Sequence, residues 1–249
     1  MKAKPKSGTR SAAKSSPKVA KAEAPRKRIF LVDDHPMMRE HMRRLIDGEP
    51  GLMCCGEAKS AEEAISEIPR CKPALVITDI TLPNRSGLDL IKDLTAMHPE
   101  VLVFVYSMHD ENFYAERALR AGARGYLMKE AGSEKMVEEL RRVLAGETSV
   151  SPKIAAKILD LFRSPRPRGS SSPVEKLTDR EFEVYQLIGE GKSTKEIAGQ
   201  LHLSAKTVAV HRGHIKEKLG LASAAELMRH AMRWSGSEGG ERTSVRRAH

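Results

Sequence analysis

Short hydrophobic runs alternate with helical patterns five times between residues 28 and 147. The strands we expect are 28–33, 51–57, 74–79, 101–107 and 125–128. The helices we expect after them are 36–48, 60–70, 87–97, 110–121 and 133–145. The third strand is apolar at successive positions, which is typical of a strand covered by helices on both faces. The pattern therefore predicts an α/β fold, a doubly wound parallel sheet built from five βα units.

The second half of the chain has a purely helical pattern. Residues 151–163 predict an amphipathic helix, with Ile154, Ile158, Leu159 and Phe162 on one stripe. Residues 164–173 are rich in Pro, Gly and Ser, which indicates a flexible linker. Four short helices should follow, starting after the capping residues Thr178, Ser193, Ser204 and Ser223. Glu181, Glu196 and Glu226 complete capping-box signatures, so we predict a small all-α domain of four helices.

Polar side chains follow four of the five expected strands. Asp33 and Asp34 follow the first, Asp79 the third, Ser107 the fourth and Lys129 the fifth. Because ligands gather beyond the carboxyl ends of parallel strands, these groups should share one cleft. Carboxylates suit Mg²⁺, and an ionised Asp79 beside a cation can act as a nucleophile toward a phosphoryl group. Any one of these residues alone is more often a helix cap or a solvated charge, so the hypothesis depends on the joint pattern.

The motifs around these residues resemble those of response-regulator receiver domains. The matching segments are 31–36 (LVDDHP), 79–83 (DITLP) with Gly87, 107–110 (SMHD) and 121–129 (AGARGYLMK). The resemblance implies that a histidine kinase phosphorylates Asp79. It also implies that Asp34, Asp79 and the backbone carbonyl of Thr81 hold Mg²⁺ or Mn²⁺, with Asp33 assisting. Glu130 stands where many receivers have proline.

The same resemblance implies a switch in which Ser107 moves toward the phosphate and Tyr126 turns inward. Simple packing is an equally good interpretation of Tyr126, an aromatic residue in an edge strand. His35 lies beside the cleft and could relay a phosphoryl group, although a loop histidine before Pro36 is more often structural.

The third helix of the C-terminal domain has two contrasting faces. At 100° per residue, Ile215 and Leu219 fall within about 20° of Val208 and should be buried. The opposite face carries small or polar residues and can approach DNA, whose major groove admits a helix. The candidate DNA-binding residues are Lys206, Thr207, Ala209, Val210, His211, Arg212, Gly213 and Lys216. The alternatives are a protein-binding bundle with a solvated charged face and, for His211, a packing role instead of a phosphate contact.

The segments 177–181 (LTDRE), 195–198 (KEIA) and 206–211 (KTVAVH), through Leu219 and Gly220, resemble the LuxR-type helix-turn-helix. Together the two resemblances make the chain similar to the NarL/FixJ family of transcriptional regulators. They imply a recognition helix at 204–219, DNA binding as a homodimer, and a dimer contact on the last helix, 223–234. Ala209 and Gly213 stand where some relatives place long polar side chains, so base readout is expected to depend on Val210, Lys206 and DNA shape.

Charge is distributed unevenly along the chain of 249 residues, whose formal net charge is +10. Residues 1–28 carry +9, residues 29–147 carry −6, and the two following segments, 148–175 and 176–249, carry +3 and +4. This asymmetry indicates nucleic acid as the partner of the basic part. The three cysteines show neither a disulfide framework nor zinc spacing, and no apolar stretch is long enough for a membrane span. We therefore expect a cytoplasmic protein.

The predicted organisation has five parts. They are a disordered basic tail (1–27), the receiver domain (28–147), a linker helix with a flexible linker (148–175), the helix-turn-helix domain (176–236) and a polar tail (237–249). We predict a DNA-binding transcriptional regulator that is activated by phosphorylation of Asp79 and catalyses only its own phosphoryl transfer and dephosphorylation. One alternative is an atypical receiver that binds DNA without phosphorylation. The other is an aspartyl-phosphate phosphatase, which would need a second Asp where Thr81 stands.

Overall fold

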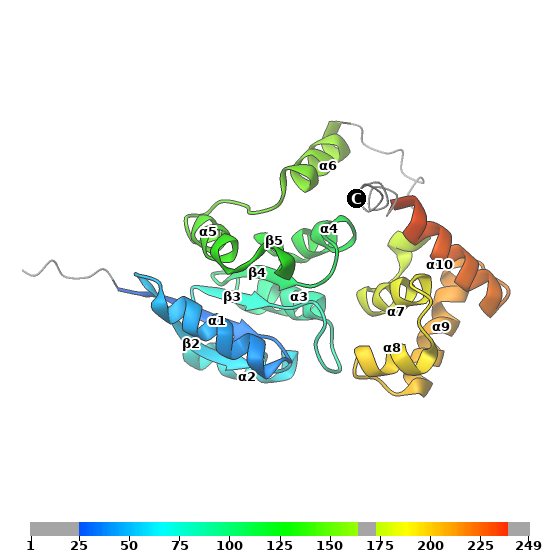
Figure 1. Cartoon of the computed structure of the whole chain (residues 1–249), viewed down its shortest axis with the longest axis horizontal. Helices are drawn as coiled ribbons and strands as arrows, with labels where there is room; N and C mark the ends of the chain where they lie inside the picture. The colour runs from blue at the N-terminus through cyan, green and yellow to red at the C-terminus, as the bar shows by residue number, and fades with distance from the viewer. Residues whose placement is uncertain (1–24, 164–172, 239–249) are drawn as a thin grey trace, which may run out of the picture.

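The computed structural model describes residues 25–163 and 173–238. Five parallel strands form one sheet in the order β2-β1-β3-β4-β5 (Figure 1). The strands are β1 (Lys27–Val32), β2 (Leu52–Ala58), β3 (Leu75–Thr78), β4 (Leu102–Ser107) and β5 (Gly125–Met128). The chain first moves outward to β2 and then crosses back over β1 to β3. This reversal makes the sheet doubly wound, as the sequence predicted.

Helices cover both faces of the sheet because successive side chains of each strand point to opposite sides. In β1, Ile29 and Leu31 belong to a hydrophobic cluster with α1 (Pro36–Gly48) and α5 (Ser133–Leu144). Phe30 and Val32 belong to a second cluster on the opposite face. That face is covered by α2 (Ala61–Cys71), α3 (Gly87–Met97) and α4 (Glu111–Ala121). The carboxyl ends of the strands remain at one edge, where the loops carry the candidate site.

One part of the linker prediction is wrong. Helix α6 (Pro152–Arg163) forms as expected, and Ile154 is buried next to α4. Leu159, however, is 61% exposed. Five residues rotate an α-helix by about 500°, so Leu159 lies about 140° from Ile154 and cannot share its stripe. The predicted basic tail, Pro/Ser-rich linker and polar tail fall mainly on residues 1–24, 164–172 and 239–249, which lie outside the described residues.

The C-terminal domain contains the four predicted helices. They are α7 (Asp179–Gly189), α8 (Thr194–Gln200), α9 (Ala205–Leu219) and α10 (Ala224–Glu238). The capping boxes Thr178–Glu181 and Ser193–Glu196 are confirmed. The third differs, because the Glu226 carboxylate accepts a hydrogen bond from the Ala222 amide instead of the Ser223 amide. Short 3-10 turns, η1 (Lys129–Ala131) and η2 (Pro173–Lys176), precede α5 and α7. Within the described residues, no helix is both long and apolar enough to cross a bilayer.

The two domains pack against each other through α7. One hydrophobic cluster continues from Tyr114 on α4 to Phe182 and Tyr185 on α7, and all three side chains are fully buried or nearly so. Charged residues of α7 are buried too, including Asp179 and Glu183. A surface helix would keep such residues in water. Their burial shows that α7 is enclosed between the sheet domain and the rest of the helical domain.

Candidate functional site

The predicted polar residues lie together at the carboxyl edge of the sheet. Asp33 and Asp79 come directly after the neighbouring parallel strands β1 and β3, and Ser107 ends β4. Their exposed fractions are only 1%, 6% and 0%, respectively. A buried carboxylate needs partners that replace its lost hydration. The arrangement of those partners defines the site.

Lys129 supplies the positive charge of the site. Its Nζ lies 2.6 Å from Asp33 Oδ2 and 2.5 Å from Asp79 Oδ2, so one ammonium bridges the two carboxylates. Burial by itself lowers the pKa of Lys129, but the charges of Asp79 and Asp33 outweigh it and the net pKa is raised. Lys129 is therefore charged at neutral pH and held at contact distance from both carboxylates.

The other oxygen of Asp79 is held by neutral donors. Oδ1 accepts hydrogen bonds of 2.6 Å from the Ile80 amide and 2.6 Å from the Ser107 hydroxyl. The loop after β3 is fixed tightly as well, because a Cβ on Gly87 would lie 1.9 Å from the Asp79 carbonyl oxygen. The Asp79 carboxylate is thus held in one orientation, as a nucleophile in a defined position requires.

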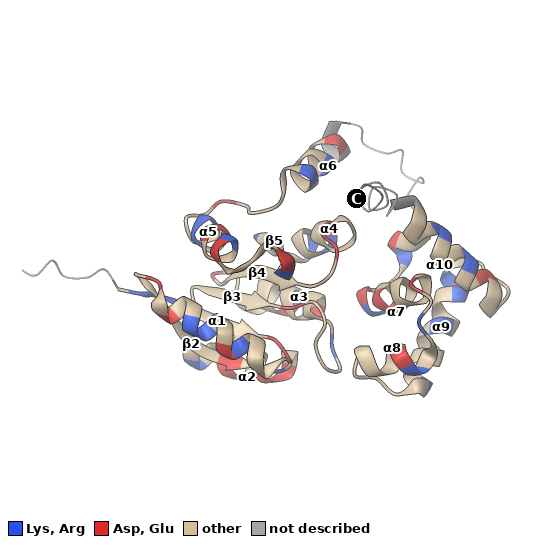
Figure 2. Cartoon of the chain, viewed as in Figure 1, with Lys and Arg blue, Asp and Glu red and all other residues tan. Residues whose placement is uncertain are grey.

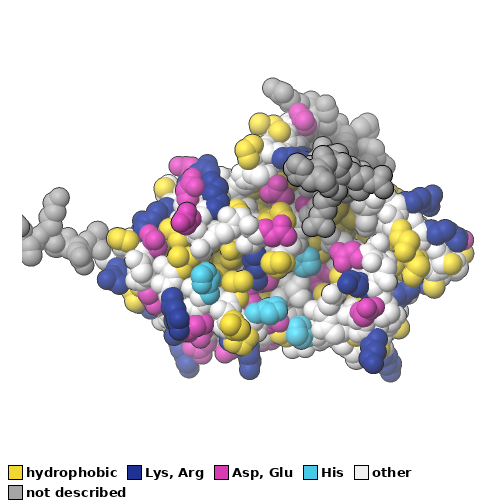
Figure 3. Space-filling view, viewed as in Figure 1, with side chains coloured by type: hydrophobic (Ala, Val, Ile, Leu, Met, Phe, Trp, Pro, Cys, Tyr) yellow, Lys and Arg dark blue, Asp and Glu magenta, His cyan; other side chains and the backbone are white. Residues whose placement is uncertain are grey.

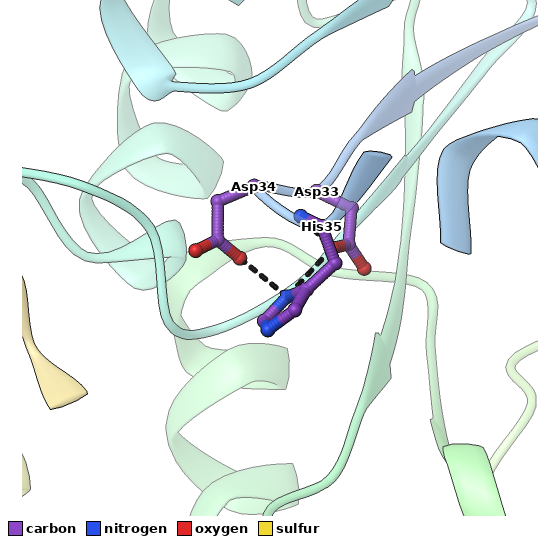
Figure 4. Close-up of side chains that lie close together, drawn as sticks. All are labelled: Asp33, Asp34 and His35. Atoms are coloured by element: carbon purple, nitrogen blue, oxygen red, sulfur yellow. Dashed lines mark hydrogen bonds and ion pairs between the residues drawn. The ribbon is translucent and has the colours of Figure 1, made fainter. Parts of the chain in front are cut away.

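Asp33, Asp34 and His35 form an acidic group beside this pair (Figure 4). One ligand atom from each residue lies within 4.8 Å of the others. Asp34 Oδ1 is buried and accepts no hydrogen bond of good geometry, although His35 Nδ1 lies 2.7 Å from it. A buried carboxylate oxygen with unused acceptor capacity suits a hard divalent cation. The donor set therefore fits the cation predicted from the sequence.

The group does not include every predicted ligand. Asp79 lies outside it, and its oxygens are held by Lys129, Ser107 and Ile80. The Thr81 hydroxyl contacts His109 Nε2 at 2.7 Å. His35 is 70% exposed, and its backbone amide donates to Asp33 Oδ1 at 2.8 Å. This contact holds the first turn of α1 against the acidic group, which agrees with the structural interpretation of His35.

Tyr126 lies inward, although β5 is an edge strand. It is 1% exposed, and its hydroxyl donates a 2.9 Å hydrogen bond to the His109 carbonyl. Burial raises the pKa of Tyr126 well above its usual range. Ser107 contacts the Asp79 carboxylate, and Tyr126 contacts the loop after β4. Both predicted switch residues therefore lie at the carboxyl ends of the strands.

Sequence reasoning missed His109. Its ring lies 4.6 Å from the Tyr114 ring, and its Nε2 meets Thr81 on the loop after β3. Burial lowers the pKa of His109, and the nearby Asp79 only partly offsets this effect. His109 thus joins the loops after β3 and β4. Its position in the motif 107–110 was the only signal that could have indicated this role.

The candidate nucleic-acid interface lies on α9. Val208 and Ile215 are fully buried and Leu219 packs beside them, which confirms the predicted stripe. The opposite face is exposed, including Lys206, Ala209, Val210 and Gly213. The Ser204 hydroxyl caps the helix by accepting from the Thr207 amide at 3.0 Å.

An open groove of about 280 Å³ lies beside this face. It is lined by Thr194 of α8, Leu227 and Ala224 of α10, and Ala209, Arg212, Gly213 and Lys216 of α9. Figure 2 shows basic residues on α9 and α10, whereas the start of α7 is acidic. His211 is half-buried, and burial followed by the charge of Arg180 lowers its pKa. A neutral, half-buried His211 agrees better with packing than with an ionic phosphate contact.

Sequence reasoning also missed the residues that join the domains. Asp179 at the start of α7 is held by Lys92 of α3 at 2.5 Å and by Arg117 of α4 at 3.1 Å. Ser86 donates a very short hydrogen bond to Glu183. Trp234 of α10 lies with its ring 4.9 Å from that of Phe113 on α4. In addition, His202 Nε2 lies 2.9 Å from Asp34 Oδ2, so the helical domain contacts the acidic group itself.

Comparison with known proteins agrees with both halves of this architecture. Residues 29–141 match the response regulator receiver domain, and residues 175–231 match the bacterial regulatory proteins of the luxR family. The chain is 36% identical over 209 residues to the response regulator GacA of Pseudomonas protegens, covering 82% of this chain and 97% of that protein. The chain belongs to the NarL/FixJ family of response regulators.

Other members of the NarL/FixJ family show the same domain pair. The transcriptional activator protein ExaE of Pseudomonas putida is 39% identical over 201 residues, 80% of this chain and 93% of that protein. The structure of RcsB from Salmonella enterica serovar Typhimurium, bound to the promoter rprA, is 21% identical with a TM-score of 0.54. It covers 83% of this chain and 98% of that chain, and at this identity it supports the fold alone. The family assignment makes the chain a transcriptional regulator and not a classical enzyme.

Proposed function

We propose that a partner sensor histidine kinase phosphorylates Asp79 and that this modification controls how the chain binds double-stranded DNA. The main support is the Lys129 ammonium, 2.5 Å from Asp79 Oδ2 and 2.6 Å from Asp33 Oδ2. The Lys129 ammonium would neutralise negative charge on the oxygens around Asp79 without forming a covalent bond. Phosphoryl transfer depends mainly on positioning and on such charge neutralisation.

The proposed chemical step forms one bond to phosphorus and breaks another. An Asp79 carboxylate oxygen forms a bond to phosphorus while the phosphorus–nitrogen bond of the donor phosphohistidine breaks, and the product is an acyl phosphate. The Ile80 amide and Ser107 hydroxyl hold Oδ1, so that Asp79 needs little reorientation. Lys129 pairs with the phosphoryl oxygens that carry the developing charge. Hydrolysis of the acyl phosphate restores the carboxylate.

Asp33, Asp34 and Asp79 with the Thr81 carbonyl are the proposed ligands of Mg²⁺, or of Mn²⁺. The unused acceptor capacity of Asp34 Oδ1 supports this assignment. When bound, the cation neutralises carboxylate and phosphoryl oxygens. Ser107 and Tyr126 are the proposed switch residues, supported by their buried contacts with Asp79 and the His109 carbonyl.

The exposed face of α9 is the proposed DNA-reading surface. Lys206, Thr207, Ala209, Val210 and Gly213 would face the major groove, while Arg212 and Lys216 would lie toward the backbone. His211 would pack beneath this face, in line with its half-buried position. We infer that the phosphorylated chain binds DNA as a homodimer, with α10 as a contact between the two copies. We also infer that it works in the cytoplasm, where the DNA that it binds is located. The exposed methionines Met228 and Met232 on α10 support the dimer contact.

The proposal is tested by treating the chain with Mg²⁺ and a small phosphodonor such as acetyl phosphate. Mass spectrometry should detect one added phosphoryl group, and peptide mapping should place it on Asp79. Asp79→Asn should block the addition, whereas Asp160→Asn, a change at an exposed position of α6, should not.

DNA binding of treated and untreated chain is then compared on fragments recovered from the genome by the phosphorylated protein. Affinity should rise on treatment in the wild type and in Asp160→Asn, but not in Asp79→Asn. Equal affinity in all samples would favour the alternative of a receiver that binds DNA without phosphorylation. Sustained turnover of small phosphate esters would instead favour the phosphatase alternative.

A further inference from the structure

His202 connects the DNA-binding domain to the acidic group of the receiver domain. It lies in the turn between α8 and α9, with a backbone φ of +52°. Its Nε2 lies 2.9 Å from Asp34 Oδ2, where the Asp34 side chain is 11% exposed and the His202 side chain 47%. Histidine side chains gather on this face along the seam between the sheet domain and the helical domain (Figure 3). The turn that starts the recognition helix is therefore attached to the first acidic loop.

This contact uses the carboxylate that a cation would need. One oxygen of Asp34 faces His35 Nδ1 at 2.7 Å, and the other faces His202. A ring nitrogen that carries hydrogen presents positive charge to the oxygen, as a metal ion does. A carboxylate spreads one negative charge over both oxygens, so a hydrogen-bond donor on Oδ2 weakens the attraction that a metal ion on Oδ1 feels, and the two positive groups repel each other. His35 belongs to the same loop as Asp34, but His202 belongs to the other domain.

We propose that His202 is a positioning residue that competes with the divalent cation for Asp34. Cation binding at Asp34 displaces the imidazole and detaches the α8–α9 turn from the receiver domain. Conversely, attachment of the turn weakens cation binding. The inference depends on the proposed function in one respect, namely that Asp34 is a ligand of the cation.

The strength of the effect follows from the type of contact. A polar contact at a half-exposed site contributes modestly, so its removal should tighten cation binding by about two- to five-fold. Linkage requires that the cation weakens the attachment of the turn by the same factor. The contacts of Asp179 with Lys92 and Arg117 also join the domains, and they do not involve Asp34. The cation alone therefore loosens the domains without separating them completely.

The test uses the full chain and Mg²⁺ alone, without phosphodonor. The backbone amide resonances of residues 33–35 give the Mg²⁺ dissociation constant by titration. Trp234, the only tryptophan of the chain, packs against Phe113 of the receiver domain, so its emission reports how the domains are held.

The test variant is His202→Asn, because asparagine tolerates a positive φ and is too short to reach Asp34. The matched control is His214→Asn, a change at an exposed histidine of the same domain that pairs with Glu181 at 3.8 Å.

The expected result is a two- to five-fold lower Mg²⁺ dissociation constant for His202→Asn and an unchanged value for His214→Asn. Mg²⁺ should also change Trp234 emission in the wild type and have a smaller effect in His202→Asn. An unchanged or weaker affinity in His202→Asn would overturn the inference. If His202→Asn does not fold, His202→Gly removes the side chain at the same backbone conformation and decides in its place.

One further variant separates the two proposals. If Asp34→Asn binds Mg²⁺ as tightly as the wild type, Asp34 is not a ligand, and both the proposed cation site and this inference are wrong. If Asp34→Asn weakens binding while His202→Asn has no effect, the proposed site stands and this inference alone is rejected.

Discussion

The guanidinium of Arg117, on helix α4 of the receiver domain, lies 4.0 Å from the centre of the Phe182 ring on α7. The same group donates hydrogen bonds to the Asp179 carboxylate at 3.1 Å and to the Val174 carbonyl at 3.1 Å. One cation thus combines an aromatic contact with charged and neutral hydrogen bonds.

We expect Arg117→Lys to loosen this contact even though the charge is kept. Lysine lacks the planar fork that serves several acceptors at once and stacks on an aromatic ring. The loss should amount to about 1–2 kcal/mol of docking free energy. Trp234 emission and the rate of proteolysis between the domains are the measurements. Arg120→Lys is the matched control, because Arg120 pairs with Glu116 within the same helix; equal effects of the two changes would contradict the assigned role.

Lys129→Met should slow phosphorylation of Asp79. Methionine has a similar length but cannot neutralise the phosphoryl oxygens, and loss of one such group typically lowers the rate by about 10²-fold or more. The initial rate of acyl phosphate formation with acetyl phosphate is the measurement. Lys59→Met, at an exposed position beside α2, should leave the rate unchanged. A rate within a factor of about two of the wild type would rule out the role given to Lys129.

The capping box of α7 should make the stability of the helical domain depend on pH. Glu181 is buried and accepts from the Lys218 ammonium at 2.6 Å and the Thr178 amide at 2.8 Å. Burial by itself raises the pKa of Glu181. The hydrogen bonds from Lys218 and Thr178 and the charge of Lys218 lower it by more, so the net pKa lies below the ordinary 4.5. A carboxyl group with a lowered folded-state pKa stabilises the fold above its unfolded-state pKa, and this stabilisation disappears as the pH falls through the folded-state value.

Glu181→Gln should therefore reduce the free energy of unfolding at pH 7 by about 1–2 kcal/mol. The difference from the wild type should shrink as the pH falls below the ordinary carboxyl pKa and through the lowered folded-state pKa of Glu181, where its carboxylate becomes protonated. Urea unfolding at several pH values measures it. Glu196→Gln removes the equivalent carboxylate from the exposed box of α8 and should have a smaller effect. A difference that is independent of pH would show that the charge of Glu181 contributes nothing.

Gly87→Ala should disturb the loop after β3. The added methyl group would lie 1.9 Å from the Asp79 carbonyl oxygen, so the loop after β3 must move. We expect a loss of about 1–3 kcal/mol in unfolding free energy, together with slower phosphorylation. Gly48→Ala, where nothing lies within 4 Å of the added atom, is the control for urea unfolding. A wild-type phosphorylation rate in Gly87→Ala would show that the position of the loop is not critical.

The sequence predicted that the polar side chains of Asp33, Asp79 and Lys129 lie together because sheet topology alone brings the strand ends to one edge. Lys129 is 96 residues from Asp33 and 50 residues from Asp79 along the chain, yet parallel strands put the loops that carry them at one edge. The amphipathic pattern similarly predicted the buried side of α9, with Val208 and Ile215 at its centre. In both cases a local pattern and a general packing rule were sufficient.

The contacts between the domains could not be predicted in this way. Asp34 and His202 come from different domains, as do Arg117 and Phe182, and the segment between the domains has no pattern that fixes their relative position. Asp179 and Glu181 read as ordinary acidic residues in the first turn of a helix, and only the folded chain shows that both are buried. The error at Leu159 was of another kind, since the helical period itself excluded it from the stripe.

The outward face of α9 remains accessible while α7 is held against the receiver domain, and Val210 at its centre is 48% exposed. Enclosure of α7 therefore leaves uncovered the side chains that we propose to read DNA. Under the proposed function, control of gene expression then depends on how two copies are brought into register on adjacent half-sites, and not on a shield that is lifted off this surface.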